Sequence, residues 1–164
     1  MKREDIGPLA GWKPHNTTRK TKAYIKDAIK PNKDVYVFGI ELTKTGQLIG
    51  TVELYNFKHQ SADTGLIIHP NFQGQGHGKT TIKAILHFCF EHLFLKRVYY
   101  RTFTENNASI YLMRAMGFKL LSVKYRGYTL FDGQKKDLMV AALNVEDYRT
   151  QPALSDPNMT VKAT

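Results

Sequence analysis

A glycine-rich segment between a strand-like run and a helix-like run constrains this chain most. Its sequence is His69-Pro-Asn-Phe-Gln73-Gly-Gln-Gly-His-Gly78-Lys-Thr, with glycine at alternate positions 74, 76 and 78. Glycines at this spacing free the backbone to aim several N–H groups at one point, and the helix N-terminus that follows adds partial positive charge. The pattern therefore predicts a strand–loop–helix unit that binds a phosphate or pyrophosphate group.

Two better-known phosphate-binding loops do not fit this segment. The dinucleotide fingerprint requires G-x-G-x-x-G, whereas the glycines here are spaced as Gly74-x-Gly76-x-Gly78. The Walker loop matches only at Gly78-Lys79-Thr80, because its first glycine would fall on Gln73. A dinucleotide-binding domain and a P-loop NTPase are therefore both disfavoured.

The hydrophobic periodicity predicts a mixed α/β chain with one domain over residues 1–148 and a poorly ordered tail over 149–164. The expected helices cover residues 18–30, 80–94 and 108–116, and the expected strands cover 35–40, 48–57, 65–68, 97–103, 118–130 and 138–145. Hairpins thus dominate the first part of the chain, and a strand–loop–helix–strand unit forms its middle.

Composition narrows the function classes. A hydrophobic share of 42% argues against intrinsic disorder, and the net charge of +10 indicates an anionic partner such as nucleic acid, a nucleotide cofactor or the ribosome. One cysteine excludes an internal disulfide framework, and His87 and His92 lack the i, i+4 spacing of a metal pair, so no metal site is expected. No apolar run reaches about 18 residues and the N-terminus does not resemble a signal peptide, so a cytoplasmic protein without a membrane partner is expected.

Three motifs in order resemble the GNAT (Gcn5-related) N-acetyltransferases. Gln73-x-x-Gly76-x-Gly78 is similar to the pyrophosphate loop of that family. Downstream, Asn106-Asn-Ala-Ser109 followed by Gly117-Phe118 resembles the family's N-x-x-S/A … G-F segment. The opening Leu9-Ala-Gly-Trp-Lys-Pro-His15 is most similar to the RimJ/RimL-like branch, the ribosomal-protein acetyltransferases.

The resemblance implies a GNAT fold, with a mixed, mostly antiparallel central sheet whose middle strands splay apart, flanked by helices. Residues 1–16 are too few and too polar for the family's usual first strand, so that strand is expected to be missing or replaced by another segment.

The same resemblance implies where acetyl-CoA binds. The backbone of Leu66, Ile67 and Ile68 would pair with the pantetheine arm, with an N–H near Ile67 facing the thioester oxygen. The pyrophosphate would be held mostly through main-chain N–H groups of the loop residues Gln73, Gly74, Gly76, Gly78 and Lys79. Asn106 would contact the cofactor from the next strand end. His77 lies within the loop and His69 before it; either lines the site or serves only structure.

Direct attack of a neutral amine on the thioester needs a base and a proton donor for the departing thiolate. A hairpin turn flanked by Phe57 and Ala62 would place Glu53 opposite residue 66, beside the expected reaction centre, so Glu53 is the first candidate for the base. Asp63 is the second. For both, an ordinary solvated carboxylate is the alternative.

The proton donor is where the chain departs from many GNAT enzymes. Those enzymes have a tyrosine four residues before the glycine of Gly-Phe, and here Met113 stands at that position. The ribosomal branch often has a serine three residues after the asparagine instead. Ser109 matches that pattern and is the candidate donor.

The function implied is transfer of the acetyl group of acetyl-CoA to a primary amine, first of all a protein N-terminal amine. A cationic polyamine fits less well, since such substrates usually meet acidic clefts and this chain has few carboxylates; an aminoacyl-tRNA suits the positive charge better. A non-catalytic CoA-binding regulatory module is the alternative from another class. An acidic or ribonucleoprotein partner and a homodimer are left open.

Overall fold

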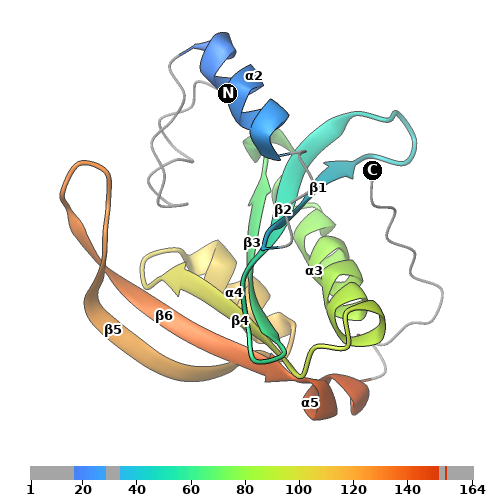
Figure 1. Cartoon of the computed structure of the whole chain (residues 1–164), viewed down its shortest axis with the longest axis vertical. Helices are drawn as coiled ribbons and strands as arrows, with labels where there is room; N and C mark the ends of the chain where they lie inside the picture. The colour runs from blue at the N-terminus through green and yellow to red at the C-terminus, as the bar shows by residue number, and fades with distance from the viewer. Residues whose placement is uncertain (1–16, 29–33, 152–153, 155–164) are drawn as a thin grey trace.

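One six-stranded sheet organises the residues that the structure describes, which are 17–28, 34–151 and 154 (Figure 1). In this computed structural model the strands are β1 (Tyr36–Glu41), β2 (Leu48–Lys58), β3 (Ser61–Ile68), β4 (Arg97–Phe103), β5 (Lys119–Thr129) and β6 (Lys135–Asn144). The helices are α2 (Thr18–Ala28), α3 (His77–His87), α4 (Asn107–Ala115) and α5 (Val145–Arg149), with a 3-10 turn over Pro70–Phe72 and a π-helical turn over Phe88–His92. The predicted mixed α/β class is confirmed. The expectations for a first strand and for most of the tail fall on residues outside the described ranges.

The sheet opens between its two middle strands. Its order is β1-β2-β3-β4-β6-β5, and every neighbouring pair is antiparallel except β3 and β4, which are parallel. The β3–β4 ladder joins Ser61–Thr64 to Arg97–Tyr100, although β3 continues to Ile68 and β4 continues to Phe103. The predicted splay of the middle strands is therefore confirmed, and it begins beyond Thr64 and Tyr100.

The β2–β3 hairpin has a shorter turn than the sequence predicts. Lys58 pairs with Ser61 across a two-residue turn, His59-Gln60, in which both residues have positive φ. Two residues of β2, Asn56 and Phe57, then oppose one residue of β3, and Asn56 also has positive φ. This β-bulge shifts the register by one position.

Because of the bulge, Glu53 pairs with Gly65 and not with Leu66, so the predicted register is wrong by one residue. The shift matters because successive side chains of a strand point to opposite faces. Glu53 shares a face with Gly65 and Ile67, whereas Leu66 lies on the opposite face.

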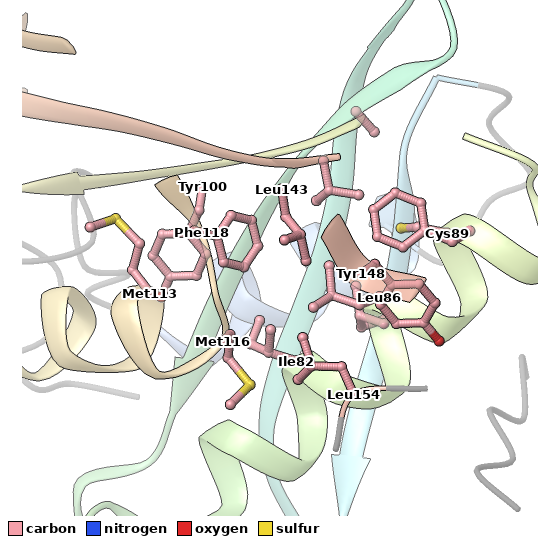
Figure 2. Packing of buried hydrophobic residues seen from close by; sticks show 14 of the residues in the cluster. Ile82, Leu86, Cys89, Tyr100, Met113, Met116, Phe118, Leu143, Tyr148 and Leu154 are labelled. Carbon is pink, nitrogen blue, oxygen red and sulfur yellow. The ribbon is translucent and has the colours of Figure 1, made fainter. Parts of the chain in front are cut away.

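The hydrophobic core lies on one face of the sheet, under α3, α4 and α5. Val52 and Leu54 of β2 contribute to it, as do the helix residues Ile82 and Leu86, all at most 2% exposed. Figure 2 shows Leu154 beside Ile82 and Leu86, and Leu154 is 3% exposed, so at least this residue of the tail is part of the core. Glu53, between Val52 and Leu54, points to the other face, where α2 lies.

Helix α3 begins three residues earlier than predicted. Its N-cap is Gly76, whose left-handed backbone (φ 86°) turns the loop directly into the helix at His77. The helix proper ends at His87 and continues as the π-helical turn, in which the Leu93 N–H donates to the Phe88 carbonyl at 3.0 Å. The early start brings the first helical N–H groups into the glycine-rich loop.

Candidate active site

Two glycines of the glycine-rich loop have open space where a side chain would begin. Gly74 and Gly76 have φ of 74° and 86°, conformations that favour glycine, and a Cβ added to either would have no heavy atom within 4 Å. No side chain caps the N-terminus of α3. The N–H groups of its first turn, from His77 to Lys79, have no acceptor within the helix. These donors and the helix dipole fit a phosphate or pyrophosphate group of acetyl-CoA.

Gln73 builds the loop. Its side-chain Nε2 donates to the carbonyl of Ile68 at 2.8 Å, and its main-chain N–H donates to Pro70 at 3.1 Å. The main-chain N–H and one of the two Nε2 hydrogens are therefore occupied within the protein. These bonds fix the loop against the end of β3, and the direct contact of Gln73 with the pyrophosphate stays a prediction.

The three glycines have different environments. Gly78 has an ordinary helical backbone, and a Cβ there would lie 3.4 Å from Leu112, 3.6 Å from Leu66 and 3.7 Å from Ile68. These are ordinary van der Waals distances, so neither the space nor the backbone at Gly78 requires glycine. Gly74 and Gly76 are the glycines of the loop whose backbone conformation favours glycine.

Lys79 is held at the edge of this site by a residue that the sequence did not single out for binding. Its Nζ donates to the Tyr111 hydroxyl at 3.0 Å and lies 4.8 Å from the centre of the Tyr111 ring. The hydrogen bond and the charge of Lys79 lower the pKa of Tyr111. The pair links the first turn of α3 to α4, and its ammonium group is suited to a phosphate.

Asn106 and Ser109 lie on the β4 side of the opening. Asn106 is the N-cap of α4, and its Oδ1 accepts from the main-chain N–H of Ser109 at 3.1 Å. The Ser109 hydroxyl is 3.0 Å from that of Tyr100. Met113, where many GNAT enzymes have a tyrosine, is 1% exposed and packs in the core near Phe118 (Figure 2). Within the described ranges, the Asn106 side-chain N–H₂ has no hydrogen-bond partner, and the Ser109 hydroxyl has one, that of Tyr100.

Glu53 lies on the face of the sheet that α2 covers. The Tyr24 hydroxyl, from α2, donates to Glu53 Oε1 at 2.9 Å. Burial, then the charge and hydrogen bond of Glu53, raise the pKa of Tyr24 to about 12, so its phenol stays protonated at neutral pH. Among the described residues no cation is paired with Glu53.

Asp63 has a structural environment. It is 2% exposed, and its carboxylate accepts from Arg101 Nε at 2.9 Å and Nη2 at 3.3 Å and from Asn56 Nδ2 at 2.8 Å. The carboxylate in turn raises the pKa of Arg101. The carboxylate oxygens of Asp63 are thus engaged by three donor groups within the protein, whereas the described contact of Glu53 is the Tyr24 hydroxyl. The geometry therefore favours Glu53 over Asp63 as the base.

Two tyrosines of the sheet, Tyr55 and Tyr128, were not predicted from the sequence. Burial, followed by the charge of Asp63, raises the pKa of Tyr55 to about 12. The Tyr128 ring packs against Phe103 at 5.4 Å, and its charge also affects Tyr55. Tyr55 lies on the same face of β2 as Glu53, because the two residues are two positions apart on the strand. Alternation along β2 is the signal that could have pointed to Tyr55.

Neither a membrane span nor a metal cluster is found in the described part of the chain. None of the helices there is long and apolar enough to cross a membrane. The same residues contain no group of three or more His, Cys, Asp or Glu side chains that could hold a metal ion. His69 accepts from the Asn71 N–H at 3.2 Å and stacks edge-on against Phe72, as its structural alternative implies.

The glycine loop, the split sheet and the capped α4 define a class of protein. The profile of the acetyltransferase (GNAT) domain matches residues 3–119, which is more than half of the chain. The chain therefore belongs to the GNAT acetyltransferase family, and the predicted resemblance is confirmed.

Individual relatives agree with this assignment. A spermidine N(1)-acetyltransferase of Vibrio cholerae is 38% identical over 73 residues, covering 43% of this chain and 42% of the relative. The aligned regions span less than two thirds of the curated relatives' own lengths.

Two solved structures share the fold. The spermidine N-acetyltransferase of Vibrio cholerae in complex with CoA and spermine has a TM-score of 0.74 at 23% identity, covering 91% of this chain and 95% of that one. Mycobacterium smegmatis RimJ in complex with CoA-disulfide has a TM-score of 0.74 at 21% identity, covering 87% and 73%. The predicted GNAT fold is thereby confirmed.

Proposed function

We propose that this protein is an N-acetyltransferase that transfers the acetyl group of acetyl-CoA to a primary amine. The observation that carries the proposal is the bare loop backbone at Gly74 and Gly76, which leads into an α3 N-terminus without a side-chain cap, beside the opening of the sheet. Family membership supports the same activity. When bound, acetyl-CoA supplies the activated acetyl group.

The residues that would bind the cofactor and the residue that would accept the proton lie on different faces of the sheet. The loop and Lys79 bind phosphate, and Asn106 orients the cofactor from α4. The backbone of Leu66, Ile67 and Ile68, beyond the β3–β4 ladder, pairs with the pantetheine arm. Glu53 takes the proton that the attacking nitrogen loses, directly or through water. Ser109 faces the departing sulfur.

The acceptor that this site fits best is a small cationic amine. A carboxylate beside the neutral phenols of Tyr24 and Tyr55 stabilises a protonated amine by charge and by cation–π attraction. The curated relatives named spermidine N(1)-acetyltransferase support this choice. The small-molecule amine thus replaces the protein N-terminus as the first candidate, in spite of the few carboxylates in the chain.

An acetyl-transfer assay with a panel of acceptors tests the proposal. CoA release is measured with spermidine, a simple diamine, a peptide with a free N-terminus and an aminoacyl-tRNA. We expect the small amines to be acetylated fastest. Preference for the peptide would return the acceptor to a protein N-terminus, and tight CoA binding without release for any acceptor would indicate a regulatory module.

Glu53→Gln is the decisive variant. General-base catalysis contributes about 10²–10⁴-fold, so we expect kcat to fall by at least 100-fold with acetyl-CoA binding unchanged. Glu41→Gln is the matched control, because Glu41 is an exposed carboxylate at the end of β1. Equal kcat values for the Glu53 and Glu41 variants would contradict the assignment of the base.

A further inference from the structure

The hydroxyl groups of Tyr100, which is buried, and Ser109, which is partly buried, lie next to each other where the sheet splits. Thr64 and Tyr100 are the last residues paired between β3 and β4, and the strands separate beyond them. Tyr100 is 4% exposed, and its hydroxyl lies 3.0 Å from Ser109 Oγ in the first turn of α4. Among the described residues, Ser109 is the hydrogen-bond partner of that hydroxyl.

Both members of the pair are held in place. The Ser109 backbone is fixed by the Asn106 cap at 3.1 Å. The Tyr100 ring packs edge-on against Phe118 at 5.3 Å, in the core that also contains Met113 (Figure 2). A phenol costs free energy to bury unless its hydroxyl is paired, so the contact with Ser109 constrains both side chains.

The 3.0 Å geometry admits either hydroxyl as the donor, and we take the phenol as the donor because it is a stronger acid than the serine hydroxyl. Burial raises the pKa of Tyr100, and the Ser109 hydrogen bond only partly offsets it, so the phenol keeps its proton at neutral pH. A protonated phenol that donates to Ser109 Oγ occupies the lone pair facing it. The Ser109 hydrogen is then directed away from Tyr100, because its oxygen is already accepting there.

We propose that Tyr100 is a positioning residue that donates to Ser109 and thereby aims the Ser109 hydroxyl at the sulfur leaving the thioester. This inference rests on the proposed function. In the reaction the C–N bond forms and the C–S bond breaks, its electron pair goes to sulfur, and the nitrogen's proton goes to Glu53 or water. Ser109 stabilises the thiolate by a hydrogen bond, and the sulfur takes a proton from solvent after release.

Tyr100→Phe tests the pair, because it keeps the ring and removes only the hydroxyl. We expect kcat to fall about tenfold, with KM for acetyl-CoA within twofold of the original. Tyr148→Phe is the matched control, since Tyr148 is fully buried and its hydroxyl contacts His87 at 3.3 Å, away from the opening. Both variants should lose a similar few degrees of Tm, but only Tyr100→Phe should lose kcat.

The double variant separates positioning from packing. We expect Ser109→Ala to lower kcat by about 30-fold, and adding Tyr100→Phe to it to cause less than a twofold further loss, since the two groups act as a unit. Additive losses would overturn the proposal. So would an equal loss of kcat in Tyr148→Phe, or an unchanged kcat in Tyr100→Phe.

The affinities of the protein for CoA and desulfo-CoA test the Tyr100–Ser109 pair even if no amine is acetylated. At pH 8.5 we expect the wild-type protein to bind CoA about fivefold more tightly than desulfo-CoA, which lacks the sulfur that accepts from Ser109. The ratio should fall below twofold in Tyr100→Phe and in Ser109→Ala. If the wild-type protein shows this affinity ratio but acetylates no amine, the proposed function is contradicted and the role of the Tyr100–Ser109 pair is supported. Equal affinity ratios in all three proteins would contradict the role of the Tyr100–Ser109 pair alone. Absence of CoA binding would contradict both this role and the proposed function.

Discussion

Alanine substitutions at two glycines with the same φ can separate the free-energy cost of backbone strain from the loss of ligand binding. Gly76 and Gly133 both have φ of 86° and open space around the Cβ position, but Gly133 lies in the β5–β6 turn, outside the glycine-rich loop. Alanine at either position is strained in the same way. The comparison therefore isolates what the loop does for the ligand.

We predict that Gly76→Ala and Gly133→Ala each lower the free energy of unfolding by about 1 kcal/mol, measured by urea denaturation. Only Gly76→Ala should weaken acetyl-CoA binding, by about tenfold or more in calorimetry, because it disturbs the N–H groups at the start of α3. Equal acetyl-CoA affinities in the two variants would show that the loop is not the pyrophosphate site.

Several residue contacts could not be predicted because their partners are far apart in the sequence. Tyr24 and Glu53 are 29 positions apart, and Asp63 and Arg101 are 38 positions apart. The sequence identified Glu53 as the first candidate for the base and Asp63 as the second, with an ordinary solvated carboxylate as the alternative for both. Only the Arg101 ion pair, which depends on the parallel pairing of β3 with β4, separates a structural carboxylate from one available for chemistry.

At the scale of elements, Asn106 caps α4, and we propose that the same residue also binds the cofactor. Asn106 Oδ1 caps the helix, which leaves the side-chain amide N–H₂ for the cofactor. Serine is also a good N-cap but has no amide donor. Replacing the asparagine can therefore preserve one role while it removes the other.

We predict that Asn106→Ser keeps the Tm within about 2 °C and raises KM for acetyl-CoA about three- to tenfold. Asn106→Ala should do both: it should raise KM and lower the free energy of unfolding by about 1 kcal/mol, because the cap is lost. Steady-state kinetics and thermal denaturation distinguish the variants. An unchanged KM in Asn106→Ser would leave Asn106 with the capping role alone.

The elements themselves were largely predictable, and the errors have local causes. Alternating and 3.6-residue periodicities identified the described strands and the helices α2, α3 and α4. The β2–β3 turn was missed because His59 and Gln60 adopt positive φ without the glycine or asparagine that usually indicates such a turn. The bulge at Asn56 left no signal either, and it shifted Glu53 by one register position.

At the scale of the whole molecule, a ligand in the opening would contact both halves of the sheet. The loop and the exposed end of β3 lie on one side, and Asn106 and Ser109 lie on the other. The described surface also includes exposed cations on β5, such as Lys124 and Arg126. Part of the net charge of +10 thus lies away from the cofactor loop, and an anionic partner, a homodimer and a cytoplasmic location all remain predictions.

We predict that acetyl-CoA stabilises the folded protein in proportion to its occupancy. At a concentration 100 times Kd the gain is about 2.7 kcal/mol, which should raise Tm by several degrees in differential scanning calorimetry. ATP at the same concentration is the control for general phosphate binding. A shift of equal size with ATP would contradict a site that recognises the whole cofactor.

The short parallel ladder between β3 and β4 also has a consequence for the order of assembly. Most strands of the sheet pair with a sequence neighbour: β1 with β2, β2 with β3, and β5 with β6. The pairing of β3 with β4, in contrast, forms only after the chain has crossed over through α3. Strand pairings across a long connection form late in folding, because the conformational entropy of the connecting chain is lost before the contacts of the pairing form. With four residue pairs it is also the shortest ladder of the sheet. Transient opening of the native state should therefore begin at the β3–β4 ladder, which would provide a bulky cofactor with a route of entry.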